Sequence, residues 1–401
     1  MGSIMVINVV LLMYSFIMCV PGHTGIRNIL TVLGVVTTLY LYRNKIIAMI
    51  REVPICILGA YTVFCLTLIV ASLLVNDTES IYMAFDFVKW CFPFVLVYLF
   101  PKNSRSYEYV LLGLALGVFY IGASGIYDFI FLVRNRVQGI FAHPNAMGTH
   151  MSLLLPVTVT YFVEFCRKQY NSKWLKFLVG IFLIVGIVGM FLTKSRGAIL
   201  GVSIGLIITG ISYCINNYKG VIILKIMTVV FIVSSVLIGV LYSTNGNKLS
   251  RSYDNERLLL IESSYNMWND HKLYGIGLAN WEKEYSSKYI LPQAKEPDLE
   301  RPHNIFAYYF STTGLIGGIG FCSFLLLIIY YCFSRICGIT NGGLFTLAIL
   351  WMLISIGFHS CVDYGLIVKE VFRCFNFLLG FGISMIEIKG LLFSEGKNMY
   401  R

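Results

Sequence analysis

The residues best suited to chemistry stand at the start of an apolar stretch, in the sequence RPHNIFAYYFSTTG at residues 301–314. Pro302 is tolerated at a helix start, so His303 and Asn304 are predicted to occupy the first turn of the helix that follows. A helix N-terminus disfavours the imidazolium form, and a neutral imidazole can act as a general base near neutral pH. The alternative interpretation is a polar anchor at a membrane interface.

Two short segments carry paired basic residues: Arg134 and Arg136 in RNRVQGIFAHPN, and Lys194 and Arg196 in TKSRGAIL. Guanidinium groups bind phosphate oxygens in a bidentate way that an ammonium group cannot. We therefore expect the side of the membrane on which these four basic residues lie to bind a phosphate or a pyrophosphate. The alternative is that these side chains reach lipid headgroups or pair with acidic residues of the loops.

A long polar segment, residues 244–303, is where function is most expected. Asp254 is predicted to cap a helix that begins near Asn255 and is ended by Gly275 and Gly277. The apolar side chains of this helix fall on one face, which we expect to lie on the membrane surface or on the helix bundle. This face consists of Leu258, Ile261, Tyr265 and Trp268.

Arg257 falls in the first turn of the same predicted helix, beside the apolar face. From this position its side chain can reach back to the membrane interface. The alternative is a surface salt bridge with Glu256 or Glu262.

The elements that must hold these residues are membrane-spanning helices. Of the 401 residues, 57% are hydrophobic and 13% are charged, and this charged share is well below the roughly one quarter of a soluble domain. Crossing a hydrocarbon core takes roughly 20 helical residues, and twelve apolar runs of about this length occur in the chain. They lie near residues 4–20, 26–42, 54–75, 81–100, 109–131, 145–166, 177–193, 198–215, 221–243, 304–333, 342–358 and 364–388.

Basic residues set the orientation of these helices. If the N-terminus is cytoplasmic, the inner loops carry fifteen Lys and Arg residues and the short outer loops carry five, as the positive-inside rule favours. The even helix count then returns the C-terminus to the cytoplasm and places residues 244–303 outside. We predict an all-α polytopic membrane protein of about twelve transmembrane helices, forming a single transmembrane domain over residues 1–401 that includes this long loop.

A resemblance to a known family is carried by HNIFAYYFSTTGLIG, in which His303 and Asn304 are followed after nine residues by Gly314 and then by Gly317. This pattern resembles the H-N-x9-G-x-x-G signature of bacterial O-antigen ligases. TKSRGAIL resembles the S-R-G-A segment of that family, NERLLLIESSYNMWNDHKLYGIGLANW its arginine-bearing loop helix, and FAHPNAMGTHMSLLLP its sixth-helix entry. Together these segments extend the resemblance over roughly residues 130–380.

The resemblance implies a GT-C-like, metal-independent and nucleotide-independent glycosyltransferase of the bacterial inner (cytoplasmic) membrane, without a cofactor and with its active site on the periplasmic face. Ligases of this family transfer an undecaprenyl-pyrophosphate-linked glycan to a sugar hydroxyl of lipid A-core. By position, His303 would take the proton of the acceptor hydroxyl, and Arg196 and Arg257 would hold the pyrophosphate. Positioned guanidinium groups lower the barrier when they bind the leaving group more strongly as its charge develops.

The partners implied are the lipid-linked glycan donor, the lipid A-core acceptor and membrane lipids, with no nucleic acid; a polysaccharide polymerase is a candidate protein partner. Asp363, in HSCVDYG, is a candidate to orient His303 or to bind sugar, and the alternative is a satisfied interfacial carboxylate. Arg373 could face the lipid pyrophosphate, or pair with an acidic neighbour as a structural intramembrane charge. The same ambiguity applies to Asp86, Lys89 and Lys369, and the other substrate-binding candidates are Arg134, Arg136, Lys194 and Asn304.

Two other functions compete with the ligase. A related O-antigen or capsule polymerase would use the same donor and extend a lipid-linked chain. A flippase or transporter of lipid-linked glycans should carry charges near the membrane midplane, often with inverted repeats and interrupted helices. Because the distinctive polar residues here gather on one surface, the sequence favours a one-sided enzyme.

Overall fold

The computed structural model describes residues 2–42, 52–100, 102–103, 105–169, 172–216, 251–336 and 343–398. Within this part of the chain the secondary structure is entirely helical, as the fold class predicted from the sequence requires. The helices are α1 (Gly2–Cys19), α2 (Thr24–Tyr42), α4 (Ile55–Val75), α5 (Thr78–Leu99), α6 (Ser106–Ile130), α7 (Pro144–Arg167), α8 (Lys173–Leu192), α9 (Arg196–Asn216), α11 (Arg251–Asp270), α12 (Trp281–Glu284), α13 (Ile305–Ile336), α14 (Gly343–Ser360) and α15 (Lys369–Asn398).

Nine of the described helices are long and apolar enough to cross a membrane, and two shorter apolar helices, Met5–Cys19 and Gly25–Tyr40, precede them. These eleven helices coincide with eleven of the twelve predicted segments. The remaining prediction, residues 221–243, lies outside the described residues. The chain is therefore a polytopic membrane protein.

The helices pack as long pairs, with α13 on α4, α14 on α9 and α7, α6 on α8 and α1, and α15 on α5. Small residues allow some of these close approaches, as expected where lipid supplies no hydrophobic drive for association. A Cβ added to Gly189 of α8 would lie 2.6 Å from the Cα of Gly122 of α6. Larger side chains at this crossing would push α6 and α8 apart.

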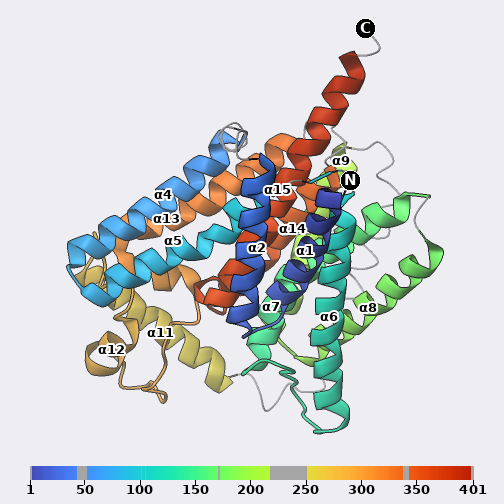
Figure 1. The fold of residues 1–401 in the computed structure, drawn as a ribbon. Helices are drawn as coiled ribbons and strands as arrows, with labels where there is room; N and C mark the ends of the chain where they lie inside the picture. Colours follow the sequence, from blue (N-terminus) through green and yellow to red (C-terminus); the bar gives the residue numbers. More distant parts are fainter. Residues whose placement is uncertain are drawn as a thin grey trace.

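The long polar loop lies at one end of the helix bundle. Figure 1 shows α11 and α12 at the lower left, whereas the end of α15 projects at the top and the start of α1 also points upward. We refer to the end that carries α11 and α12 as the loop end. The first and last helices thus begin and end at the opposite side of the bundle from the loop.

Helix α13 is interrupted at Gly314. The backbone there has φ 61° and ψ −156°, a combination that is essentially restricted to glycine. A Cβ at this position would lie 2.3 Å from the carbonyl carbon of Leu273. Gly314 therefore both breaks the helix and makes room for the segment that follows α11.

That segment, residues 272–277, fills the break with its own backbone. Non-helical backbone at membrane depth is tolerated where protein satisfies its polar groups, and four hydrogen bonds do so here. Those bonds run from Leu315 N to Lys272 O (2.8 Å), Ile316 N to Leu273 O (3.1 Å), Ile276 N to Ser311 O (3.0 Å) and Gly277 N to Thr312 O (2.9 Å). These hydrogen bonds dock the end of α11, the helix that carries Arg257, onto α13, the helix that follows His303.

The loop helix α11 differs from its predicted form. It begins at Arg251, so Asp254 lies inside the helix and is not its cap, and it ends at Asp270, before the two glycines that dock onto α13. Leu258 and Tyr265 are 65% and 57% exposed, so the predicted apolar face does not pack on the bundle as a whole. The face that does pack inward includes Glu256, Leu260, Ser263, Ser264 and Met267.

Candidate active site

His303 lies two residues before the first residue of α13, and not in its first turn as the sequence predicted. Its φ is +50°, an uncommon conformation that concentrates at functional sites in proteins. Asn304 is the residue that caps the helix, because its Oδ1 accepts a hydrogen bond from the Ala307 N–H at 2.9 Å. The Asn304 amide also donates to the Cys361 carbonyl at 2.9 Å, which ties the start of α13 to the turn after α14.

That turn brings Asp363 to His303. The His303 Nδ1 atom lies 3.5 Å from Asp363 Oδ1, and the carboxylate side chain is only 8% exposed. Burial acts to raise the pKa of Asp363, but the His303 and His359 rings outweigh it, and the net pKa lies below the ordinary value. Asp363 is therefore a buried carboxylate that is kept ionised beside an imidazole.

A second histidine meets the other oxygen of the same carboxylate. The His359 Nε2 atom, in the last turn of α14, lies 3.8 Å from Asp363 Oδ2 and 2.7 Å from Thr149 Oγ1 of α7. Asp363 therefore lies between two imidazoles, and its Oδ1 also accepts from the Tyr364 N–H at 2.8 Å. This arrangement draws on α7, α14 and the residue before α13.

The His303 ring packs against an aromatic residue. The rings of His303 and Tyr364 lie 4.9 Å apart at an angle of 59°, and the Arg301 guanidinium lies 5.1 Å from the centre of the Tyr364 ring. Tyr364 and Asp363 are consecutive residues of the turn. One short segment thus both contacts the ring and supplies its carboxylate partner.

Positive charge gathers at the same place around His143, the residue that caps α7 by accepting from the Asn145 N–H at 3.2 Å. Burial lowers the pKa of His143, and the nearby charge of Arg136 lowers it further, while Asp363 acts in the opposite direction. The charges of His303 and Arg257 also act on this ring. His143 is therefore held in its neutral form within a group of cationic side chains.

Arg257 belongs to this group. Its charge acts on both His143 and His359, so the guanidinium lies within electrostatic range of the two histidines although it comes from the loop helix. Neither alternative salt bridge forms among the described residues, and the Glu256 carboxylate instead accepts from the Lys295 N–H at 3.1 and 3.3 Å. Of the two interpretations of Arg257, the structure therefore favours a place near the histidines over a surface salt bridge with Glu256 or Glu262.

Arg196 is the first residue of α9 and is exposed. The next residue, Gly197, packs against the turn that holds Asp363, since a Cβ there would lie 2.4 Å from Val362 and 2.9 Å from His359 Nδ1. This contact places the start of α9 against the end of α14. Arg196 is thereby held at the border of the site, at the N-terminus of a 21-residue helix.

The remaining basic candidates have structural contacts of their own. Arg136 donates to the Asn145 side chain at 2.9 Å and to the Thr193 carbonyl at 3.2 Å, which braces the start of α7 against the turn before α9. Arg134 forms an ion pair with Asp128 at 3.2 Å. Lys194 donates to the side chain of Asn135.

Arg373 occupies a different place. It lies one turn into α15, where its charge acts on Arg27 of α2 and on Tyr14 of α1. Glu370 acts on the same Arg27 guanidinium. The structure thus groups Arg373 with a buried arginine and a glutamate, and its predicted role toward the lipid pyrophosphate stays a prediction.

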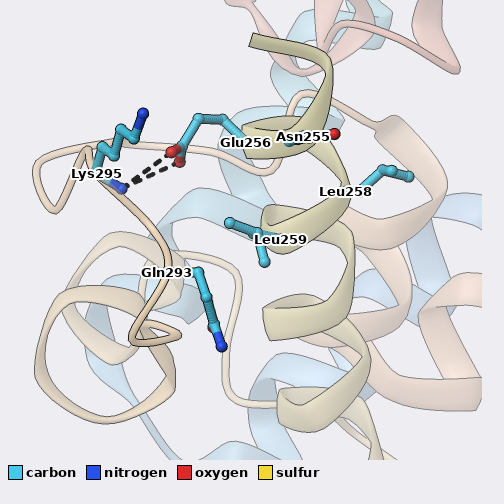
Figure 2. A pocket seen from close by; sticks show the side chains of 6 residues that line it. All are labelled: Asn255, Glu256, Leu258, Leu259, Gln293 and Lys295. Carbon is cyan, nitrogen blue, oxygen red and sulfur yellow. Dashed lines mark hydrogen bonds between the residues drawn. The ribbon is translucent and has the colours of Figure 1, made fainter. Parts of the chain in front are cut away.

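A separate hollow of about 330 Å³ opens between α11 and the segment around residue 294 (Figure 2). The Glu256 carboxylate meets the backbone of Lys295 at its edge, as the dashed lines in Figure 2 show. None of the residues that line it was predicted as a site residue. Its lining consists of Asn255, Glu256, Leu258, Leu259, Gln293 and Lys295.

Two residues of the site, His143 and His359, were not among the candidates predicted from the sequence. Each lacked a flanking pattern like that of His303. The spacing His359-x-x-x-Asp363 is a signal that could have found one of them, because two ionisable residues so close in the chain, at the end of an apolar segment, can lie near each other in space. His143 gives no such signal, since its place depends on the contact between α7 and the rest of the site.

Chemically, the arrangement offers an imidazole 3.5 Å from a buried carboxylate, and the charge of at least one guanidinium acts on the neighbouring histidines. Such a group can take a proton from a hydroxyl, and the cations can bind an anionic leaving group. Within the described residues, no group of three or more His, Cys, Asp or Glu side chains is placed to hold a metal ion. Metal independence itself stays a prediction.

The fold and the site together define a multi-pass membrane protein with a histidine and carboxylate site at its loop end. Residues 181–322, about a third of the chain, match the model of the O-antigen ligase family. Over this segment the chain is similar to the family, which supports an O-antigen ligase-family protein of glycosyltransferase-like ligase or polymerase type. It includes Arg196, Arg257 and His303, but it is narrower than the predicted resemblance and does not reach Asp363. No curated protein matches the chain.

Proposed function

We propose that the protein transfers undecaprenyl-pyrophosphate-linked O-antigen polysaccharide to a sugar hydroxyl of lipid A-core, on the periplasmic face of the bacterial inner membrane. The observation that carries the proposal is the 3.5 Å approach of His303 Nδ1 to the buried Asp363 carboxylate, in a cluster on whose other histidines the charge of Arg257 acts. The family match supports the reaction class. The loop end of the bundle is then the periplasmic end, and both termini are cytoplasmic.

In this reaction His303 is the general base. Because its Nδ1 side faces Asp363, the Nε2 atom is left for the substrate, and the carboxylate favours the tautomer with a proton on Nδ1. The acceptor hydroxyl gives its proton to Nε2 while its oxygen attacks the anomeric carbon of the donor sugar. The bond from that carbon to the pyrophosphate oxygen breaks, and undecaprenyl pyrophosphate leaves with the electron pair.

Arg257 and Arg196 are proposed to bind the pyrophosphate. Negative charge grows on the leaving oxygen in the transition state, so cations held in place before the reaction lower the barrier. Arg196 is the first residue of α9, and the positive end of a helix dipole is a favourable place for phosphate oxygens. Both arginines lie at the border of the same histidine cluster, one from α9 and one from the loop helix.

The interruption of α13 is the observation that favours a transporter, because broken helices are frequent in such proteins. Here, however, the backbone of residues 272–277 fills the break and satisfies its hydrogen bonds. The break therefore serves to dock the loop helix. A polymerase shares the donor and the proposed site residues, and differs from the ligase in its acceptor.

The test is a transfer assay with purified protein, undecaprenyl-pyrophosphate-linked glycan, and lipid A-core present or absent. We expect glycan on lipid A-core, visible as a ladder of larger products on a gel. Longer lipid-linked chains formed without use of the core would assign a polymerase instead. Movement of donor across vesicle membranes without covalent transfer would identify a transporter and contradict the proposal.

A further inference from the structure

His359 is buried in the middle of the site and is not needed as a base in the proposed reaction. Its side chain is 1% exposed, and its ring nitrogens face different surroundings. Nε2 meets Thr149 and Asp363, while Nδ1 has no hydrogen-bond partner among the described residues. Nδ1 packs instead against Gly197.

The contacts of Thr149 fix where the proton of this imidazole lies. The Thr149 hydroxyl has one proton, and it donates that proton to the Asn145 carbonyl at 2.9 Å. In the 2.7 Å contact with His359, the same oxygen must then accept. The proton is therefore on Nε2, the nitrogen that also faces Asp363 Oδ2.

The two oxygens of Asp363 consequently have different partners. Oδ1 accepts from the Tyr364 N–H and faces His303, while Oδ2 faces the Nε2–H of His359. A carboxylate held at only one oxygen can rotate about its terminal torsion, which is broad for aspartate. The Nε2–H side of the His359 ring, 3.8 Å from Oδ2, opposes this rotation electrostatically and favours the orientation in which Oδ1 faces His303.

We infer that His359 is a positioning residue, which together with Thr149 fixes the Asp363 carboxylate so that it orients His303. This inference rests on the proposed function. His359 also seats the N-terminus of α9 through its contact with Gly197, the residue after Arg196. The buried His359 ring thereby has two effects. Through Asp363 it orients His303, and through Gly197 it positions the start of α9, which carries Arg196.

The first test compares two substitutions at this position. The amide nitrogen of glutamine is the same number of bonds from Cα as imidazole Nε2, so His359→Gln keeps an N–H donor toward Thr149 and Asp363. His359→Phe keeps the ring volume and loses the donor. We expect His359→Phe to lower kcat by about 10- to 100-fold with little change in the KM for the donor, and His359→Gln to recover most of the loss.

Thr149 provides a second variant with a matched control on the same helix. Thr149→Val removes the hydroxyl that holds His359 and should lower kcat in the same direction. Thr158→Val removes a buried hydroxyl that only bonds the Leu154 carbonyl of its own helix, at 2.7 Å, and should leave kcat unchanged. Equal losses of kcat from both substitutions would overturn the inference.

A double-mutant cycle separates positioning from a purely structural role. If His359 acts through Asp363, His359→Phe should cost little more in an Asp363→Asn protein, measured as single-turnover rates. A full additional loss in that background would show that His359 supports the fold alone. His303→Ala in the same assay tests the proposed function separately: if it is inactive while His359→Phe is fully active, only the positioning role is wrong.

Discussion

Replacing Gly314 with alanine tests whether the docking of the loop helix holds the site together. Alanine cannot adopt φ 61° and ψ −156° without strain, and conformations of this kind cost about 1–3 kcal/mol. The new Cβ would also lie 2.3 Å from the Leu273 carbonyl carbon, and overpacking of this kind adds about 1–3 kcal/mol. The expected loss of stability is therefore about 2–6 kcal/mol.

The same substitution should also reduce transfer. The segment that would be displaced, residues 272–277, ties α11 to α13 through four backbone hydrogen bonds. If this segment moves, α11 is no longer fixed relative to α13, and Arg257 loses its position relative to His303. Activity should fall in membranes that contain normal amounts of the protein.

Stability can be measured by denaturant titration in detergent micelles, and transfer by the gel assay, with Gly59→Ala as the control. Gly59 lies inside α4, and a Cβ there meets nothing within 4 Å. Alanine at this position should be neutral or stabilise the helix by up to about 1 kcal/mol. A Gly314→Ala protein that matches the wild type in stability and transfer would refute the role given to this break.

Three further substitutions test the electrostatics of the site. Arg257→Lys keeps the charge but loses the bidentate fork, so transfer should fall and the KM for the donor should rise; full activity would exclude bidentate pyrophosphate binding. Asp363→Asn should lower kcat by roughly 100-fold or more, as for other carboxylates that orient a catalytic histidine, and unchanged kcat would remove Asp363 from the mechanism. The pKa of His143 is lowered by burial, so the unfolded chain binds a proton first as the pH falls and stability is lost below about pH 6.5. His143→Asn keeps a capping side chain and should flatten the fall of the thermal midpoint between about pH 7 and 5; equal slopes in both proteins would show that His143 does not contribute.

The membrane helices could be predicted from the sequence because length and apolarity alone decide them. A run of about 20 apolar residues has few alternatives in lipid. The break in α13 could not be predicted in this way. Gly314 belongs to the H-N-x9-G-x-x-G pattern, but that pattern does not indicate a break; the positive φ and the contact with Leu273, about 40 residues earlier in the chain, are seen only in the structure.

The loop helix shows a second limit of sequence patterns. Leu258 and Tyr265 share a helix face with other apolar residues, but the bundle packs on a neighbouring face that includes Glu256 and two serines. Periodicity finds an apolar face and does not tell whether protein or membrane covers it. The exposure of Leu258 and Tyr265 is consistent with the membrane surface, the other surface considered in the prediction.

The residues of the candidate site that could be selected from the sequence are those that stand in a recognisable local pattern. His303 and Asn304 stood out through their position at a helix start, and Asp363 through a carboxylate near a membrane surface. His359 and His143 could not be ranked, because their role depends on three helices that meet only in the folded chain. The structure brings these residues together, and whether they act in transfer stays a prediction.

The most direct test of the proposed mechanism is the single-turnover rate of His303→Ala with bound undecaprenyl-pyrophosphate-linked glycan and saturating lipid A-core. Donor binding is measured in the same preparation. If His303 is the general base, the rate should fall by about 10²- to 10⁴-fold while donor binding is retained. A rate within a few-fold of the wild type, with normal donor binding, would contradict the base assignment.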